Sequence, residues 1–391
     1  MRKVALLLLG LLVLGLAAQS SAAPLPSTLP APLAAGGTAR EDAASSCLPL
    51  AWEVETVDGS LGAGWRSSLE LDTAGRPHIS YYNGSSHHGW YAFYDGSAWQ
   101  TQMPDGGWAA GCYCSLALDA QDRPRISYYG GSGNLKYASY DGSAWQLEEV
   151  DHSSDVGYFT SLALDATGNP HIAYFDWALY DLRYARRTET AAQGAWQVQV
   201  VDDGEYAGYD PSLALDAAGQ PHISYYGNDD LRYTSFGGTG WVTETVDRRG
   251  DVGSFTSLAL DAAGRPHISY FDVTNGDLKY ACFDGANWST ATVDSAGLVG
   301  EYTSLALDAQ GRPRISYYDH TNGDLKYACF DGSAWQVQTV DEVGGMFTSL
   351  ELDAAGRPHI GYRSAPGLMY AQGVAPVERA YLPLVGRGAG P

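Results

Sequence analysis

Basic residues are scarce in this chain of 391 residues. It has 23 Lys and Arg against 45 Asp and Glu, which gives a formal net charge of −22 at pH 7. A surface this acidic repels phosphate backbones and anionic lipid headgroups. We therefore expect no nucleic-acid partner, whereas neutral sugars, cations and extracellular proteins remain open as ligands.

Long apolar runs are missing except at the N-terminus. There, Val4–Ala18 follows Arg2 and Lys3 and is succeeded by small residues up to Ala23. A basic start, a short apolar run and a small-residue exit are typical of a secretory signal peptide. The run is shorter than the ~20 residues of a membrane span. The sequence predicts a signal peptide at 1–23, a secreted or cell-surface location and no membrane span.

Several catalytic motifs are also missing. The chain has no Gly-x-Ser-x-Gly, no His-Glu-x-x-His, no P-loop and no dinucleotide-binding fingerprint. A pair of carboxylates for glycoside hydrolysis stays open, because such a pair depends on a distance in space that sequence spacing does not reveal.

Cysteine is rare, and the five residues of a secreted chain leave at least one unpaired. Cys282 and Cys329 occupy the same place in neighbouring repeats. One interpretation is a bridge from Cys47 to Cys112 or Cys114. The alternative, which we favour, is a set of unpaired, inert thiols, because strands rather than crosslinks carry the repeat.

Internal repetition is the main feature that the chain does have. The sequence Ser-Leu-(Ala/Glu)-Leu-Asp recurs every 45 to 51 residues. It begins at Ser68, Ser115, Ser161, Ser212, Ser257, Ser304 and Ser349. A unit of this length is typical of one four-stranded blade of a β-propeller.

The fifth unit shows how four strands fit into one repeat. Alternating patterns and β-branched or aromatic residues predict strands at 257–261, 267–271, 278–283 and 288–293. The sequences Asp-Ala-Ala-Gly, Asn-Gly and Asp-Gly between them are typical turns.

The seventh unit stops after three strands, and its missing strand stands before the first unit. Ala51–Asp58 matches Ala334–Asp341, the fourth strand of unit six. A strand that joins the two ends of the chain closes a ring and covers the edges of its sheets. We therefore predict an all-β, seven-bladed β-propeller of four-stranded antiparallel blades over 47–372, with the last blade closed by the N-terminal strand.

The remaining segments are short. Residues 24–46 are rich in Pro and Ala and predict a flexible linker. Residues 373–391 form a C-terminal tail. We expect the closed ring to be a monomer.

The repeat resembles those of bacterial secreted propellers related to the sialidase-like (Asp-box, or BNR) superfamily. The resemblance rests on Asp-Ala-x-Gly-Arg-Pro-His-Ile-Ser-Tyr-Tyr, Leu-Lys-Tyr-Ala and Asp-Gly-x-x-Trp, and it covers 52–372. The Asp-box match is partial, because Ser139–Trp145 lacks the residue between Asp and Gly. Sialidases carry an early Arg-Ile-Pro, whereas Arg125 and Arg314 here precede Ile-Ser at a repeat position. The resemblance implies the fold and does not imply sialidase catalysis.

Residues that recur in most blades are expected to shape the blade rather than to bind a ligand. Five histidines share the slot after Pro, namely His78, His171, His222, His267 and His359. Seven aspartates close the first strand and are expected to form its turn, namely Asp72, Asp119, Asp165, Asp216, Asp261, Asp308 and Asp353.

Two loops are rich in oxygen ligands. Asp272 and Asp277 flank one loop, and Asp319 and Asp324 flank the other. Calcium takes six to eight oxygen ligands. These loops lack the bidentate Glu of an EF-hand, and their Asn-Gly is already explained as a hairpin turn. We expect no cofactor, with calcium at these loops as the alternative.

Candidate ligand-binding residues lie where the repeats differ. Loops between blades, and loops that join second and third strands, emerge on one face of a propeller. Aromatic and polar groups on such a face suit sugar rings. The candidates of this kind are Trp90, Trp108, Trp177, Tyr180, His87 and His88.

Two arginines replace residues that are aromatic in most repeats. Arg66 enters blade one and Arg363 lies in blade seven, and these blades are neighbours in a closed ring. Two arginines are suited to hold a carboxylate. Pairing with the protein's own carboxylates is the alternative. Asp210 replaces the corresponding aromatic residue that enters blade four.

We predict a secreted, non-enzymatic propeller that binds a glycan, as a lectin does, or an extracellular protein on its loop face. One alternative is a sialidase-like or other glycan-cleaving enzyme, and another is a structural cell-surface repeat protein. A deep central pocket with Arg66, Arg363 and two close carboxylates would indicate the enzyme. Shallow pockets between blades would indicate a lectin, and a flat acidic face would indicate a structural protein.

Overall fold

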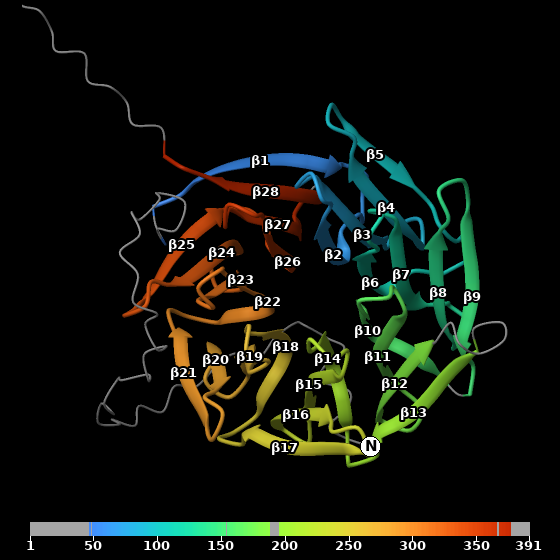
Figure 1. Cartoon of the computed structure of the whole chain (residues 1–391). Helices are drawn as coiled ribbons and strands as arrows, with labels where there is room; N and C mark the ends of the chain where they lie inside the picture. The colour runs from blue at the N-terminus through green and yellow to red at the C-terminus, as the bar shows by residue number, and fades with distance from the viewer. Residues whose placement is uncertain (1–46, 48, 154, 188–194, 366, 377–391) are drawn as a thin grey trace, which may run out of the picture.

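The computed structural model describes residues 47, 49–153, 155–187, 195–365 and 367–376. The predicted signal peptide and linker, and most of the predicted tail, lie outside the described residues. Over the described residues the chain forms seven four-stranded antiparallel sheets that surround a common axis (Figure 1). The prediction of an all-β, seven-bladed propeller is confirmed. None of the described residues forms a helix that is long and apolar enough to cross a membrane.

The strands follow one another from the axis outward in each blade. Blade one contains β2 (Trp65–Leu71), β3 (Pro77–Asn83), β4 (His88–Tyr94) and β5 (Trp99–Gln102). Blade two contains β6 (Cys112–Leu118), β7 (Pro124–Tyr129), β8 (Leu135–Tyr140) and β9 (Trp145–Asp151). Blade three contains β10 (Val156–Leu164), β11 (Pro170–Asp176), β12 (Asp181–Arg187) and β13 (Trp196–Asp202). Blade four contains β14 (Ala207–Leu215), β15 (Pro221–Gly227), β16 (Asp230–Phe236) and β17 (Trp241–Asp247).

The other three blades repeat this order. Blade five contains β18 (Val252–Leu260), β19 (Pro266–Asp272), β20 (Asp277–Phe283) and β21 (Trp288–Asp294). Blade six contains β22 (Val299–Leu307), β23 (Pro313–Asp319), β24 (Asp324–Phe330) and β25 (Trp335–Asp341). Blade seven contains β26 (Met346–Leu352), β27 (Pro358–Arg363), β28 (Leu368–Val374) and β1 (Ala51–Asp58).

Blade seven combines strands from both ends of the chain. β1 pairs with β28 in antiparallel register, from Ala51 opposite Val374 to Asp58 opposite Leu368. Figure 1 shows β1, in blue, as the outer neighbour of β28, in red. The early strand therefore takes the place that the repeat comparison predicts for it.

A ring of hydrogen bonds joins the inner strands and explains why Ser-Leu recurs. In every blade the backbone N–H of this Leu donates to the Ser Oγ of the preceding blade, at 2.9–3.0 Å. The bond from Leu69 to Ser349 crosses from blade one to blade seven. Each Ser therefore satisfies a backbone donor of its neighbour, and the seventh bond closes the ring.

Two further contacts recur at every junction between blades. A Tyr of each second strand donates to an Asp of the preceding blade, at 2.5–2.9 Å. This Asp ends the outer strand in six blades, whereas Asp105 of blade one follows β5. The Trp that opens each outer strand packs edge-on against a Tyr of the preceding blade, with ring centroids 5.2–5.6 Å apart. Burial of these rings supplies much of the apolar core between blades.

The recurrent histidines and aspartates have the structural roles that the sequence predicts. Each of the five histidines forms a hydrogen bond through Nδ1 to the hydroxyl of a Tyr on the third strand of its own blade. In the other two blades, Arg125 donates to Asp119 at 2.6 Å and Arg314 to Asp308 at 2.7 Å. The turn aspartates accept backbone N–H groups, as Asp72 does from Ala74 at 2.9 Å.

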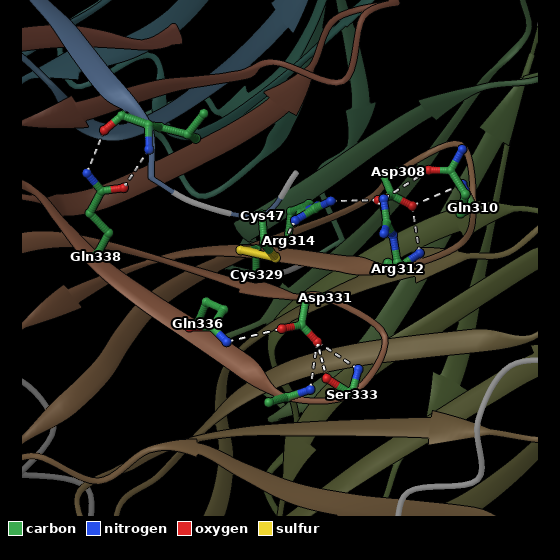
Figure 2. The surroundings of a disulfide bond; sticks show 12 residues. Cys47, Asp308, Gln310, Arg312, Arg314, Cys329, Asp331, Ser333, Gln336 and Gln338 are labelled. Carbon is green, nitrogen blue, oxygen red and sulfur yellow. Dashed lines mark hydrogen bonds and ion pairs between the residues drawn. A yellow bond between two sulfur atoms is a disulfide. The ribbon is translucent and has the colours of Figure 1, made fainter. Parts of the chain in front are cut away.

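The prediction for the cysteines is wrong, because Cys47 is bonded to Cys329 of β24 (Figure 2). The segment before β1 runs along blade six on its way to blade seven. There, the backbone N–H and C=O of Leu50 are both bonded to the side chain of Gln338. This path places Cys47 far along the ring from Cys112 and Cys114 of blade two, which remain free thiols together with Cys282.

Candidate functional site

A pocket on the propeller axis is built by one repeated backbone feature. Near the start of each inner strand, one non-glycine residue has a positive φ of 46–56°. These residues are Arg66, Tyr113, Phe159, Asp210, Phe255, Tyr302 and Phe347. A register shift accompanies each of them. Such a bulge re-aims a side chain, and here all seven side chains line one cavity of about 200 Å³.

The next residue of each strand forms a second tier of the pocket. This tier consists of Ser67, Cys114, Thr160, Pro211, Thr256, Thr303 and Thr348. The wall of the pocket therefore combines five aromatic rings and two charges in one tier with small, mostly hydroxyl-bearing side chains in the other.

An ion pair crosses the first tier of the pocket, which the seven positive-φ residues form and which we call the aromatic tier. Arg66 of blade one lies 3.7 Å from Asp210 of blade four, measured from Nη1 to Oδ1. The Arg66 guanidinium also lies 4.9 Å, 4.7 Å and 5.2 Å from the ring centroids of Tyr113, Phe159 and Phe347. These are distances at which a cation is attracted to an aromatic face. Arg66 is therefore held in place by the rings as well as by Asp210.

Asp210 is the only carboxylate among the described residues that line this pocket. Burial raises its pKa, although Arg66 and a hydrogen bond from the backbone N–H of Phe255 act in the opposite direction. Because the arginine and the aspartate balance each other, the ionised pocket has no net charge from this tier.

Two other carboxylates form an electrostatic pair farther along the inner strands. Glu70 and Glu351 stand where the other five repeats have Ala. Burial and the charge of Glu351 raise the pKa of Glu70, and burial raises the pKa of Glu351 to about 7. Glu70 follows Arg66 by four residues on β2, which corresponds to roughly 13 Å of extended strand. The pair is therefore well separated from the aromatic tier.

Arg66 and Arg363 have different partners. The Arg363 guanidinium lies 4.6 Å from the ring centroid of Trp65 and is not part of the pocket lining. Burial lowers the pKa of Arg363. Arg66 is paired with Asp210, which is the arrangement that we considered as the alternative to a carboxylate clamp.

Four of the candidate residues lie in blade one and in the loop to blade two. Trp90 is half-buried between these blades, beside a cavity of about 20 Å³, with its indole nitrogen 3.5 Å from Ser86 Oγ. Trp108 is 71% exposed, and its ring centroid lies 5.5 Å from that of His87. His88 opens β4 and is half-buried. None of the four is among the residues that line the axial pocket.

Trp177 and Tyr180 belong to an aromatic surface that reaches the pocket. Their ring centroids are 6.2 Å apart, and the Trp177 centroid lies 5.3 Å from that of Tyr158. Tyr158 in turn lies 5.2 Å from Tyr113, which lines the pocket. Tyr209 lies 6.1 Å from Trp177 and 5.8 Å from Phe159 of the pocket. The structure therefore connects these two candidates with the axis.

Two of the four candidate calcium ligands, Asp272 and Asp319, are engaged by other groups, and Asp277 and Asp324 lie opposite them on the next strand. Asp272 accepts hydrogen bonds from the backbone and side chain of Asn275, and it lies 3.7 Å from Lys279. Asp319 lies 2.8 Å from Lys326 in the equivalent loop. Among the residues that the structure describes, no three His, Cys, Asp or Glu side chains are grouped in a way that could hold a metal ion.

Fold and site together define a seven-bladed β-propeller with an aromatic pocket on its axis. No protein-family model and no curated protein matches the chain. Among solved structures, the chain is similar to AofleA from Arthrobotrys oligospora, with a TM-score of 0.51 and 12% identity over 75% of this chain and 91% of that one.

Two further structures are similar to the same degree. The SapL1 lectin in complex with alpha methyl fucoside has a TM-score of 0.50 and 12% identity, over 73% of this chain and 99% of that one. A PL25 ulvan lyase, a polysaccharide lyase bound to -[GlcA(1-4)Rha3S]-, has a TM-score of 0.54 and 14% identity, over 80% of this chain and 94% of that one. At these identities the likeness concerns the fold.

Proposed function

We propose that this protein is an extracellular lectin-like propeller that binds a neutral saccharide in the axial pocket without cleaving it. The proposal rests on the Arg66–Asp210 pair within a tier of five aromatic rings. Aromatic faces pack against the apolar faces of sugar rings, while fixed polar groups orient the hydroxyls. Here Arg66 would donate hydrogen bonds to sugar hydroxyls and Asp210 would accept them.

The size and charge of the pocket limit the kinds of ligand that fit it. Its volume of about 200 Å³ is below the roughly 300–1,000 Å³ of most small-molecule sites, so it suits a single sugar unit. Because Arg66 is already paired, an acidic sugar would have to compete with Asp210 for the guanidinium. A neutral sugar can interact with both groups at once.

The arrangement of carboxylates favours binding over glycoside hydrolysis. Glycosidases place two carboxyl groups roughly 5–9.5 Å apart on either side of the bond to be cleaved. Asp210 is alone in the described pocket lining, and Glu70 lies roughly 13 Å along the strand from Arg66. The resemblance of the repeats to sialidase-like propellers, and the lectin and polysaccharide lyase among similar structures, support a glycan as the ligand.

The proposal can be tested with the double variant Arg66→Phe/Asp210→Phe. Phe occupies the equivalent position in three other blades with the same left-handed backbone, so the substitution removes both charges without leaving one buried alone. On a glycan array, we expect the wild-type protein to bind neutral glycans and the double variant to lose at least tenfold in affinity. Fluorogenic glycosides should not be turned over by either protein.

Two binding results would contradict the proposal. One is a wild-type protein that binds no saccharide on the array. The other is a double variant that retains full affinity while its circular dichroism and thermal unfolding show an intact fold. Turnover of a glycoside by the wild-type protein would replace the binding function with the enzymatic alternative.

A further inference from the structure

A second hollow lies beside blade two, on the loop side of the molecule. It has a volume of about 680 Å³. Its walls are formed by Tyr129, Gly131, Ser132, Gly133, Asn134, Glu149, His152 and Asp155. The loop between β7 and β8 reads Gly-Gly-Ser-Gly-Asn, where blade five has Asp-Val-Thr-Asn-Gly-Asp. The loop of blade two is therefore one residue shorter and has smaller side chains than the loop of blade five.

Aromatic rings connect this hollow with the axial pocket. Tyr129 lines the hollow, and its ring centroid lies 4.6 Å from that of Tyr158. Tyr158 is half-buried and lies 5.2 Å from Tyr113 of the pocket. The hydroxyls of Tyr129 and Tyr158 both donate to Asp155, each at 3.3 Å. Three neighbouring rings, with a carboxylate at the border of the hollow, thus lead outward from the axis.

The residue that stands beside the pocket at the repeat position of Tyr158 differs among the blades. The repeat position of Tyr158 is also aromatic in blades one and four, where it is Trp65 and Tyr209. It is Cys112 in blade two, and it is Ser254, Glu301 and Met346 in blades five, six and seven. A ligand that extends beyond the pocket would find an aromatic ring at this position over blades one, three and four and none over blades five to seven, and in blade one the Trp65 ring already packs against Arg363.

We infer that the protein binds the end of a linear neutral oligosaccharide, with its terminal unit in the axial pocket and the following units over Tyr158 and Tyr129 into the hollow of blade two. This inference rests on the proposed function and adds the length and the direction of the ligand. Successive aromatic rings suit successive sugar units, because each ring offers an apolar face.

The charges along the path select against acidic chains. Glu149 and Asp155 line the hollow, and the whole chain carries a formal net charge of −22. Both carboxylates accept hydrogen bonds, as Glu149 does from Asn134 at 2.7 Å, and sugar hydroxyls can supply more. Uronate or sulfate groups in the same place would face like charges without a described arginine or lysine in the lining of the hollow.

The test is a calorimetric titration with linear neutral oligosaccharides of one to six units, from the glucose, mannose and N-acetylglucosamine series. We expect the affinity for the preferred series to rise at least tenfold between one and four units and then to level off. Tyr158→Ala should abolish most of this rise and change the affinity for the single unit by less than about twofold. Glu301→Ala, at the same repeat position across the axis, is the matched control and should leave the rise intact.

A second variant does not depend on the packing of Tyr158. Ser132 is exposed in the loop that borders the hollow, and Ser132→Trp would fill that space. In this variant the affinity should level off at a shorter chain length than in the wild-type protein.

The failures of the two proposals can be told apart. If single sugars bind in the pocket but affinity does not rise with chain length, the inference is wrong and the proposed function stands. A rise that survives both Tyr158→Ala and Ser132→Trp, or uronate oligomers that bind as tightly as neutral ones, also overturns the inference. If no saccharide binds the wild-type protein, both are wrong.

Discussion

Arg66 and Asp210 meet at 3.7 Å on the axis, although they belong to blades one and four and replace aromatic residues at equivalent repeat positions. Their side chains are 30% and 17% exposed, so the pair is partly shielded from water. The repeat supplies an aromatic ring at the other five positions. The pair is thus a local departure from symmetry at the one place where all seven blades converge.

Removing one partner of this pair should destabilise the fold more than removing both. Arg66→Ala leaves Asp210 without its counter-charge, and we expect a loss of about 1–2 kcal/mol at pH 7, less than for a fully buried pair. The double variant Arg66→Phe/Asp210→Phe should be close to the wild-type protein. Urea unfolding of the wild-type, single and double variants measures this difference.

The pH dependence of the stability of Arg66→Ala tests whether its loss of stability comes from the unpaired charge of Asp210. Burial raises the pKa of Asp210, and loss of Arg66 raises it further, so the folded state binds a proton more readily than the unfolded state. A carboxyl whose pKa is higher in the folded state than in the unfolded state lowers the free energy of unfolding as the pH rises through its titration range. The loss of stability in Arg66→Ala, relative to the wild-type protein, should therefore become smaller toward pH 4. A deficit that is the same at pH 4 and pH 8 would show that packing, rather than charge, is the cause.

Glu70 and Glu351 should make the protein less stable at alkaline pH. Burial raises the pKa of Glu351 from its ordinary value of 4.5 to about 7, and burial and Glu351 raise that of Glu70. Because the folded state holds these protons more tightly, stability falls as pH rises above about 4.5 and levels off beyond the raised values. Glu351→Ala, which restores the residue of five other blades, should add about 2 kcal/mol at pH 8 and little at pH 4.

The comparison with Glu301→Ala tests whether the position matters. Glu301 is an acidic residue of the inner strand of blade six, and it lies at a different repeat position from Glu351. If Glu351→Ala and Glu301→Ala shift the pH profile of thermal unfolding alike, the gain in stability comes from a smaller net negative charge. The pair of Glu70 and Glu351 then has no special role.

Seven copies of one motif made the fold predictable. Each Ser-Leu step, each turn Asp and each opening Trp has the same contact in every blade, so an error in reading one repeat is corrected by six others. The closing strand was predictable for the same reason, because Ala51–Asp58 has the sequence of an outer strand.

The site was only partly predictable, since it consists of departures from the repeat. The sequence shows that Arg66 and Asp210 replace aromatic residues, but not that their side chains span the axis. That depends on the bulge that re-aims each side chain and on the width of the pocket. Arg363 also replaces an aromatic residue, yet it stacks on Trp65. Tyr158 was missed because the residue at this repeat position varies from blade to blade.

The disulfide could not be found from the sequence for a different reason. Cys329 occupies a repeat position that Cys282 shares, so nothing in the repeat distinguishes the two. Which of the two cysteines bonds to Cys47 depends on the path of the segment before β1. Gln338 fixes that path, because its side chain is hydrogen-bonded to both the backbone N–H and the backbone C=O of Leu50. A non-repeated segment has no second copy against which its position can be checked.

The bond between Cys47 and Cys329 should stabilise the closed ring. It joins residues that are 282 positions apart, and a crosslink over such a distance removes much of the freedom of the unfolded chain. We expect Cys329→Ser, or reduction of the wild-type protein, to lower the free energy of unfolding by roughly 2–5 kcal/mol. Cys282→Ser is the matched control, because Cys282 holds the same place in blade five and is a free thiol. Equal losses from both substitutions would assign the effect to packing at this position.

The seam between blades seven and one should be more sensitive than an interior junction. Ser349→Ala removes the acceptor of the Leu69 N–H, and Ser212→Ala removes the equivalent acceptor of Leu258. Each change leaves a backbone donor without its partner, which costs about 1–2 kcal/mol. At the seam, however, blade seven is held together by β1 rather than by a continuous chain, so local opening there also releases an end of the polypeptide. Hydrogen exchange should therefore show that Ser349→Ala speeds exchange along β1 and β28, whereas Ser212→Ala leaves those strands protected. Equal protection of β1 and β28 in both variants would mean that the ring opens at no preferred junction.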